Sequence, residues 1–141
     1  MAGTAPEGAY ALELDVLSEH IDQLNHVNNV VYLNWVQDVA IRHWTLIAPE
    51  QMQQSMFWVV ARHELDYLRP LFLGDVAVVS TWIGAEERGL FARHTRVARK
   101  SDDATALEAL TWWCPMSMTD GRRIRDIPEE VRTLFSTVSG S

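Results

Sequence analysis

One long helical pattern constrains the fold of this chain more than any other feature. Over residues 29–47, side chains suited to a core recur at intervals of three or four positions. The first row of these side chains consists of Tyr32, Val36, Val39 and His43. A second apolar row at the same intervals makes the surface wide, so we expect a helix that is buried on most of its circumference. Such a helix needs another layer of structure around it.

Five segments with strand character supply this layer. They are residues 10–14, 57–68, 76–83, 91–99 and 105–118, and apolar side chains alternate with polar ones in them. Short turns join the last four, so these strands are expected to run antiparallel. In the second segment the odd-numbered positions from Phe57 to Tyr67 form the more apolar face, which we expect to pack on the helix. The sequence therefore predicts an α+β fold in which one antiparallel sheet covers the helix.

The C-terminal segment carries the signals of a second, short helix. Asp126 is placed to act as its N-cap, a proline fits the first turn, and a glutamate lies three residues after the cap. We expect this helix to end at about Phe135. The 141 residues contain no internal repeat, so we predict a single domain over residues 1–141, with flexible ends at residues 1–8 and 136–141.

The composition excludes several classes of protein. With 48% apolar and 22% charged residues the chain is globular rather than disordered, and its net charge of -7 argues against nucleic-acid binding by a broad basic surface. The single cysteine, Cys114, rules out an intrachain disulfide and a cysteine zinc cluster, and we interpret it as a small core residue. No segment resembles a signal peptide or a membrane span of ~20 residues. We therefore expect a cytoplasmic protein without a membrane partner.

The start of the predicted helix is rich in polar side chains. Asp22, His26, Asn28 and Asn29 lie within eight residues, directly before the apolar pattern. Either asparagine is suited to cap the helix, because a side-chain oxygen at that position accepts a backbone N–H. A helix start also presents free N–H groups and a partial positive charge, which stabilise a developing oxyanion. By residue type alone, Asp22 is better explained by a turn in which its carboxylate accepts a backbone hydrogen bond.

This segment, Asp-x-x-x-His-Val-Asn-Asn-x-x-Tyr, resembles a motif of the hotdog-fold thioesterases, above all the 4-hydroxybenzoyl-CoA thioesterase-like acyl-CoA thioesterases of bacteria. Residues 65–75 resemble that family's second strand and the turn after it. The resemblance implies a five-stranded antiparallel sheet wrapped around a long central helix. The motif is also similar to that of the plant acyl-carrier-protein thioesterases. The cysteine proposed for their site falls near Leu71 here, so we carry over no cysteine nucleophile.

The resemblance implies hydrolysis of an acyl-CoA or acyl-carrier-protein thioester to a free acid and a thiol, with no metal or other cofactor. Asp22 would act as general base or nucleophile, and the N–H near Asn29 would stabilise the oxyanion. We assign the Asn28 side chain a place near the thioester, while His26 either supports catalysis or holds the loop. The predicted substrate-binding residues are Tyr32, His63 and Tyr67, although His63 is also suited to a role as a core histidine.

Two other functions stay open at this point. A hotdog dehydratase would pair a loop histidine with an acidic residue of the central helix, for which Asp38 is available. A non-catalytic acyl-thioester binding protein would hold its ligand without turnover. Sites in this family lie between two subunits, so the resemblance also implies a homodimer or homotetramer in which residues 57–68 of the partner form the other wall.

The basic residues of the second half have two interpretations. They would either neutralise the phosphates of coenzyme A or form a solvated strand face. These residues are Arg88, Arg93, Arg96, Arg99, Lys100, Arg122, Arg123 and Arg125.

Overall fold

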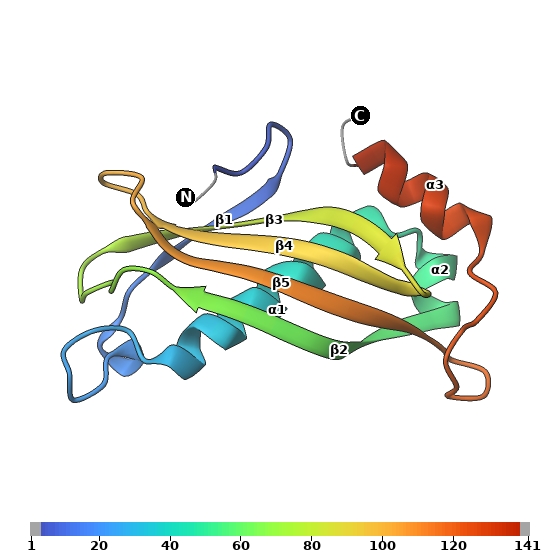
Figure 1. Cartoon of the computed structure of the whole chain (residues 1–141), viewed down its shortest axis with the longest axis horizontal. Coiled ribbons are helices and arrows are strands. Elements are labelled where there is room, and N and C mark those ends of the chain that lie inside the picture. The colour runs from blue at the N-terminus through green and yellow to red at the C-terminus, as the bar shows by residue number, and fades with distance from the viewer. Residues whose placement is uncertain (1–3, 139–141) are drawn as a thin grey trace.

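In the computed structural model, which describes residues 4–138, one antiparallel sheet curves around a long helix (Figure 1). Along the chain the elements are β1 (Tyr10–Asp15), the short turn η1 (Ser18–His20), α1 (Asn29–Ile47), α2 (Glu50–Ser55), β2 (Met56–Tyr67), β3 (Val76–Glu87), β4 (Leu90–Arg99), β5 (Thr105–Ser117) and α3 (Glu129–Val138). The sheet has the order β1-β3-β4-β5-β2, and all neighbouring strands are antiparallel. The predicted α+β hotdog arrangement is confirmed.

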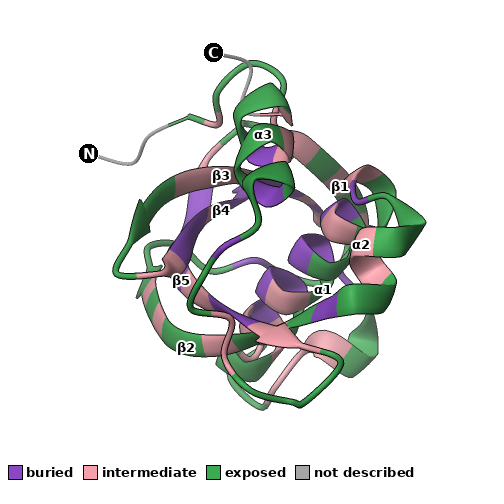
Figure 2. Cartoon of the chain, turned by 90° about the vertical axis from the view of Figure 1, so that its right-hand side faces the viewer, coloured by how far each residue is buried: buried purple, intermediate pink, exposed green. Residues whose placement is uncertain are grey.

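The helix α1 begins and ends where the apolar pattern predicts. Asn28 caps it, because its side-chain oxygen accepts the N–H of Val30 at 2.9 Å. The prediction that α1 is buried on most of its circumference is wrong, since Ile41 is 56% and Leu46 69% exposed. The sheet covers one side of the helix, and Figure 2 shows buried and exposed stretches alternating along it.

The strand β2 changes its inward face halfway along, which the predicted alternation does not allow for. Met56 is buried and Phe57 and Val59 are exposed, so the even-numbered positions face the core in the first half. The pairing with β5 then shifts between Val60 and Arg62, which leaves one extra residue in β2. This β-bulge returns the odd-numbered positions to the core side. The predicted apolar face is therefore wrong before the bulge and right after it.

Both ends of the chain differ from the expectation in detail. The helix α3 begins three residues beyond Asp126, which therefore does not cap it, and it continues past Phe135 to Val138. Residues 1–3 and 139–141, which belong to the predicted flexible ends, lie outside the described residues. The short helix α2 has no counterpart among the predicted elements.

Two hydrophobic clusters fill the space between the sheet and α1. The larger one joins the first half of α1 to the sheet through residues such as Val36, Val39 and Leu107. The smaller one joins Met56 and Phe91 to α3 at the other end of the molecule. On α1, β2, β3 and β4, polar residues lie between the members of the two clusters. These polar residues, described below, prevent the core from being one continuous apolar volume.

Candidate functional site

The loop before α1 is folded tightly by its own hydrogen bonds. The backbone N–H of Asp22 donates to the carbonyl of His26 at 3.2 Å, and that of Asn25 donates to the carbonyl of Asp22 at 3.0 Å. The carboxylate Oδ1 of Asp22 accepts the N–H of Leu24 at 2.8 Å. Asn25 adopts φ 66°, a left-handed conformation that asparagine tolerates better than most residues. The loop therefore fixes one carboxylate oxygen of Asp22 and leaves the other available.

Two backbone hydrogen bonds attach this loop to the fold. The N–H of Val27 donates to the carbonyl of Leu71, and the N–H of Asn28 donates to the carbonyl of His20. The ring of His20 in turn makes an edge contact with Trp35 of α1, with the ring centroids 5.5 Å apart. The loop is thus held between η1 and the segment that follows β2, so the start of α1 has a fixed position relative to Asp22.

The first turn of α1 presents a backbone N–H to the outside. Asn28 uses its side-chain oxygen as the cap, which confirms one of the two predicted caps. Asn29 is exposed, and within residues 4–138 its backbone N–H donates no hydrogen bond. Its carbonyl lies 3.4 Å from the hydroxyl of Tyr67 on β2. The positive end of the helix dipole therefore coincides with a free donor beside a phenol.

Tyr32 lies directly below this surface. It is 3% exposed, and its ring makes edge contacts with Tyr67 and Trp35 at centroid distances of 5.8 and 5.6 Å. Its hydroxyl is buried without a hydrogen-bond partner in the described part of the chain. Burial raises the pKa of Tyr32, so the phenol keeps its proton at neutral pH. Tyr32 therefore packs behind the site and supports the ring of Tyr67.

The structure brings most of the predicted site residues together. Asp22, His26, Asn28 and Asn29 lie on one loop and helix start, and Tyr32 and Tyr67 lie beside them through the contacts above. Between the described side chains of Asp22 and His26 there is no hydrogen bond, so their link runs through the backbone alone.

His63 lies apart from these residues. Its Nδ1 is 2.9 Å from the hydroxyl of Thr111, and its Nε2 is 3.4 Å from the side-chain nitrogen of Gln37 on α1. Gln37 lies more than a turn beyond Tyr32 along α1. Burial lowers the pKa of His63, which favours a neutral imidazole. His63 is therefore better described as part of a row of polar core residues than as part of the loop site.

This row, the polar belt, crosses the concave face of the sheet and reaches α1. It consists of Thr81 on β3, Arg93 on β4, Thr111 on β5, His63 on β2 and His43 on α1. The Nη1 of Arg93 donates to Nδ1 of His43 at 2.8 Å and to the hydroxyl of Thr81 at 3.2 Å. Burial, and secondarily the charge of Arg93, lower the pKa of His43 to about 4. The imidazole is therefore a neutral acceptor.

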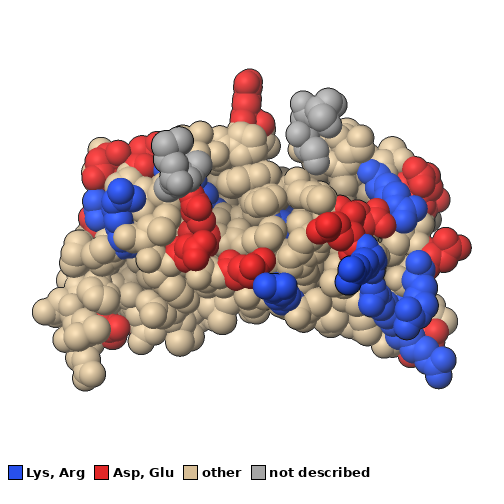
Figure 3. All heavy atoms as spheres, in the orientation of Figure 1, with Lys and Arg blue, Asp and Glu red and all other residues tan. Residues whose placement is uncertain are grey.

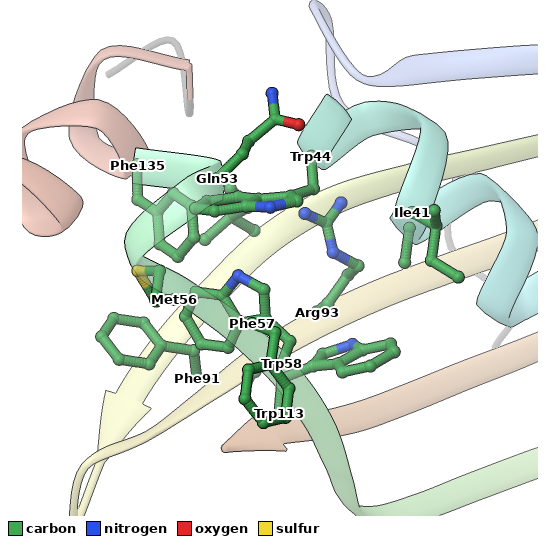
Figure 4. Close-up of a pocket in the computed structure, with 13 residues that line it drawn as sticks. Ile41, Trp44, Gln53, Met56, Phe57, Trp58, Phe91, Arg93, Trp113 and Phe135 are labelled. Atoms are coloured by element: carbon green, nitrogen blue, oxygen red, sulfur yellow. The ribbon is translucent and has the colours of Figure 1, made fainter. Parts of the chain in front are cut away.

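A cavity of about 250 Å³ adjoins the polar belt (Figure 4). Its walls are largely aromatic, with Trp44 from α1, Trp58 from β2, and Phe91 and Trp113 from the strands opposite. Arg93 is the charged residue in its lining. No distinct pattern in the sequence marks this cavity, because tryptophans in strands are expected in a packed core.

The basic residues differ in burial and in pairing. Arg93 and Arg96 are 7% and 8% exposed, so the expectation of a solvated strand face is wrong for them. Arg96, Arg99 and Lys100 are engaged in ion pairs with acidic side chains. Besides Arg93, the residues of this set that form no ion pair within residues 4–138 are Arg88, Arg122, Arg123 and Arg125. Figure 3 shows blue side chains gathered at the end of the molecule where β5 leads toward α3.

Three further observations concern the thiol, metal-binding groups and long apolar helices. Cys114 is buried, which confirms its interpretation as a core residue. In the described part of the chain, no group of three or more histidine, cysteine or carboxylate side chains is positioned to hold a metal ion. Within the same residues, no helix has both the length and the apolar character needed to cross a membrane.

A family model described as thioesterase-like superfamily matches residues 16–135 of this chain. The matched range includes the loop before α1, the helix itself and the four strands that follow.

Solved structures extend the likeness to nearly the whole chain. A thioesterase from Thermus thermophilus, crystallised with coenzyme A and zinc, is 28% identical with a TM-score of 0.79, and the match covers 95% of this chain and 96% of that chain. The 12:0-ACP thioesterase of Umbellularia californica is 19% identical with a TM-score of 0.80, over 93% of this chain and 50% of that chain. At that identity the second likeness shows the fold alone.

Curated relatives are longer proteins. The palmitoyl-acyl carrier protein thioesterase of Gossypium hirsutum is 29% identical over 109 residues, which are 71% of this chain and 26% of that protein. The dodecanoyl-[acyl-carrier-protein] hydrolase of Cinnamomum camphora is 29% identical over 73% of this chain and 29% of its own length. The chain thus spans little more than a quarter of the curated relatives that it matches.

Proposed function

Because the chain belongs to the thioesterase-like superfamily, we propose that it hydrolyses acyl thioesters of coenzyme A or of acyl carrier protein to a free acid and a thiol. The observation that carries this proposal is the start of α1, where a free backbone N–H of Asn29 lies beside the loop that holds Asp22. A donor and a carboxylate are the two groups that the reaction needs around a thioester carbonyl.

The proposed mechanism divides the work between these two groups. The N–H of Asn29 polarises the thioester carbonyl and stabilises the oxyanion that forms when the carbonyl carbon is attacked. Asp22 either removes a proton from the attacking water or attacks the carbonyl itself. The C–S bond then breaks, and the thiolate leaves and takes up a proton. In the first route the acid is released directly, whereas in the second the acyl group forms an anhydride with Asp22, which a water molecule then hydrolyses to the free acid and the aspartate. Because the loop occupies only Oδ1 of Asp22, the carboxylate keeps an oxygen for this role.

The other predicted residues take supporting roles in this proposal. Tyr67 and Tyr32 form the wall beside Asn29, with Tyr67 at the surface and the buried ring of Tyr32 behind it. His26 holds the loop through its carbonyl, and its ring is left to orient water or substrate. Asn28 contributes its side-chain oxygen to the cap, so only its amide nitrogen is free to face the thioester.

We propose that the active molecule is a homodimer or a tetramer built from two homodimers. The strand β2 lies at the edge of the sheet, and its outward side has no partner strand within the described chain. Phe57 and Val59 on this strand are 37% and 38% exposed, which is unusual for apolar residues of a long edge strand. A second copy paired along β2 would cover them. Its β2, which carries His63, would then supply the other wall of the site.

Two further parts of the proposal concern the carrier and the compartment. The arginines at the end of β5 suit an anionic carrier, whether the phosphates of coenzyme A or an acidic carrier protein. A cytoplasmic location is compatible with the single buried thiol of Cys114. The dehydratase alternative loses support, because Asp38 is exposed on α1 and no hydrogen bond joins it to His26 within residues 4–138.

The test is an Asp22→Asn variant assayed for thiol release from acyl-CoA and acyl-carrier-protein substrates. An asparagine oxygen still accepts the N–H of Leu24, so the loop should keep its shape while the carboxylate is lost. We expect turnover to fall by about 100-fold or more. The matched control is Asp38→Asn, which removes an exposed carboxylate from α1 and should leave turnover unchanged. Full activity of Asp22→Asn would reject the proposed role of this residue.

A further inference from the structure

A buried arginine without an acidic partner lies at the edge of the aromatic cavity. Arg93 is 7% exposed and forms no salt bridge within residues 4–138. Arg96, on the same strand and similarly buried, shows the usual solution: its guanidinium lies 3.0 Å from the carboxylate of Asp103. A buried guanidinium is costly unless an anion compensates its charge. Arg93 is thus the buried cation of this strand that still lacks a counter-ion.

Several donors of Arg93 remain free. Its Nη1 serves both His43 and Thr81, while Nε and Nη2 make no hydrogen bond with the described residues. His43 accepts as a neutral imidazole, so it does not compensate the charge. Three of the five N–H groups of the guanidinium are therefore available to a ligand. Figure 4 shows this side chain rising from its strand toward α1, with Trp44 on one side and Ile41 on the other.

A second unpartnered donor lines the same cavity. The indole Nε1 of Trp113 is buried and has no hydrogen-bond partner in the described part of the chain. On the sheet, Trp113 pairs with Phe91, two positions before Arg93 on the neighbouring strand, so both donors belong to one region of the concave face. The lining contains no carboxylate. The cavity therefore offers apolar walls and hydrogen-bond donors, but no acidic group.

We infer that this cavity binds the far end of an apolar acyl chain that terminates in a carboxylate, with Arg93 and Trp113 as its hydrogen-bond donors. The inference rests on the proposed thioesterase function and adds the class of acyl group. Aromatic walls at Trp44, Trp58 and Phe91 suit the apolar chain, and a planar guanidinium suits the two oxygens of a carboxylate. Ile41 and Phe57, both partly exposed in the single chain, line the cavity as well, so the cavity lies on the side where the second copy of the proposed homodimer would adjoin β2.

The position of the cavity along α1 limits the length of the chain. Asn29 begins the helix and Ala40 lines the cavity, and the rise of an α-helix places them about 16 Å apart along the axis. A short acyl group held at Asn29 of the same subunit would not reach Arg93. The inference therefore favours extended dicarboxylic acids, bound as monothioesters, over small aromatic acids.

Arg93 also has a structural role that the experiment must separate from ligand binding. Through one nitrogen it connects the sheet to α1 by way of Thr81 and His43. If this connection were its whole role, its removal would change stability and would affect all substrates equally. If it binds a carboxylate, its removal would change the preference between two acyl groups that differ only at their far end.

The first experiment compares kcat/KM for hexadecanoyl-CoA and the monothioester hexadecanedioyl-CoA in wild type and in Arg93→Met. The substitution keeps most of the length of the side chain and removes the charge. We expect wild type to prefer the carboxylated substrate, and Arg93→Met to lose at least about 10-fold of that preference. Arg96→Met is the matched control, because it removes a similarly buried arginine outside the cavity. An unchanged preference in folded Arg93→Met would overturn the inference, and Arg93→Gln replaces this variant if it does not fold.

The second experiment does not depend on hydrolysis. Trp44, Trp58 and Trp113 line the cavity, so their fluorescence reports binding of free decanedioate or decanoate to the intact protein. We expect decanedioate to bind more tightly than decanoate to wild type, and Trp113→Phe to weaken decanedioate by several-fold. Binding without thioester hydrolysis would reject the proposed function and keep this inference. Hydrolysis with no preference for a terminal carboxylate, and no binding of decanedioate, would reject this inference and keep the proposed function.

Discussion

The side chain of Asn28 has two candidate roles that a pair of substitutions separates. As the N-cap of α1, it accepts the N–H of Val30, and its loss should cost about 1 kcal/mol of unfolding free energy in Asn28→Ala. Asn28→Asp restores an acceptor and adds a negative charge at the positive end of the helix, so it should return most of that stability. Urea unfolding measures both. If Asn28→Asp is as unstable as Asn28→Ala, the cap does not stabilise the protein.

Activity of the same two variants tests the other role. An aspartate keeps the cap but lacks the amide nitrogen that would face a thioester. A normally folded Asn28→Asp with unchanged kcat would assign Asn28 to the cap alone. A large fall in kcat would indicate that the amide nitrogen contacts the substrate.

His43 makes stability depend on pH in a direction that its surroundings determine. Burial and the charge of Arg93 lower its pKa to about 4, whereas in the unfolded chain it titrates near 6.5. Above pH 6.5 it is neutral in both states and contributes no pH dependence. As the pH falls toward 4, only the unfolded state gains the proton, so the unfolding free energy decreases by up to about 3 kcal/mol. Burial also lowers the pKa values of His63 and His94, which act in the same direction.

Urea unfolding at about pH 4.5 and about pH 7.5 measures this dependence. His43→Gln keeps a polar side chain beside Arg93 but cannot bind the proton, so its two midpoints should lie closer together than those of wild type. Equal separation of the midpoints in both proteins would show that His43 does not cause the acid sensitivity.

The residues of the loop site and those of the cavity differ in how far the sequence reveals them. Asp22, His26 and the two asparagines are contiguous with the start of an evident helix, and a resemblance to a known motif adds their roles. Arg93 gives no such signal, because a strand with alternating side chains has two faces and only the packing shows which one is buried. On β4 the inward row consists of Phe91, Arg93, Thr95 and Val97, so polar residues interrupt the apolar pattern where the core is polar.

At the scale of elements, α1 and the order of the strands follow from local patterns, whereas the register of β2 does not. The bounds of α1 agree with its apolar period, and a capping residue stands at its start. The bulge in β2 depends on pairing with a strand some fifty residues later, and Ala61 carries no glycine or proline signal for it. Long-range pairing of this kind is what a local pattern cannot predict.

The bulge in β2 should be removable without changing which residues of the strand face the core. Ala61 is the residue without a partner on β5, since Val60 pairs with Trp113 and Arg62 with Trp112. Deleting Ala61 would join Val60, which faces the core, directly to Arg62, which faces outward, so His63 and Leu65 would stay on the core side in the same register with β5. The deletion removes only the local bend of the bulge, so we expect a change of less than about 1 kcal/mol in unfolding free energy.

Thermal and urea unfolding of the deletion variant measures this change. Ala61→Ser is the control, because it changes the side chain at the bulge and keeps the number of residues. A deletion variant that is several kcal/mol less stable than Ala61→Ser would mean that the bend made by the bulge is needed for the packing of β2.

At the scale of the whole molecule, the chain leaves one side of its helix and one edge of its sheet uncovered. The sheet has β1 and β2 at its edges, and β2 is the longer of the two. Exposed apolar side chains occur on β2 at Phe57 and Val59 and on α1 at Ile41. Natural proteins usually protect long edge strands with charges, prolines or a covering element. On β2 such charges occur in the second half, at Arg62 and Glu64, whereas the first half exposes Phe57 and Val59. The proposed homodimer explains why the first half carries apolar residues.

This explanation predicts the effect of a single charge on β2. Val59→Lys places an ammonium group on the exposed face of the edge strand, where it would be desolvated in a dimer and harmless in a monomer. Light scattering during size-exclusion chromatography should show a dimer or tetramer for wild type and a shift toward monomer for Val59→Lys. Leu46→Lys is the control, because Leu46 is more exposed, at 69%, and does not lie on β2. A monomeric wild type would reject the dimer, and unchanged assembly of Val59→Lys would place the interface elsewhere. Because a dimer stabilises each subunit by mass action, the melting temperature of wild type should also rise with protein concentration more than that of Val59→Lys.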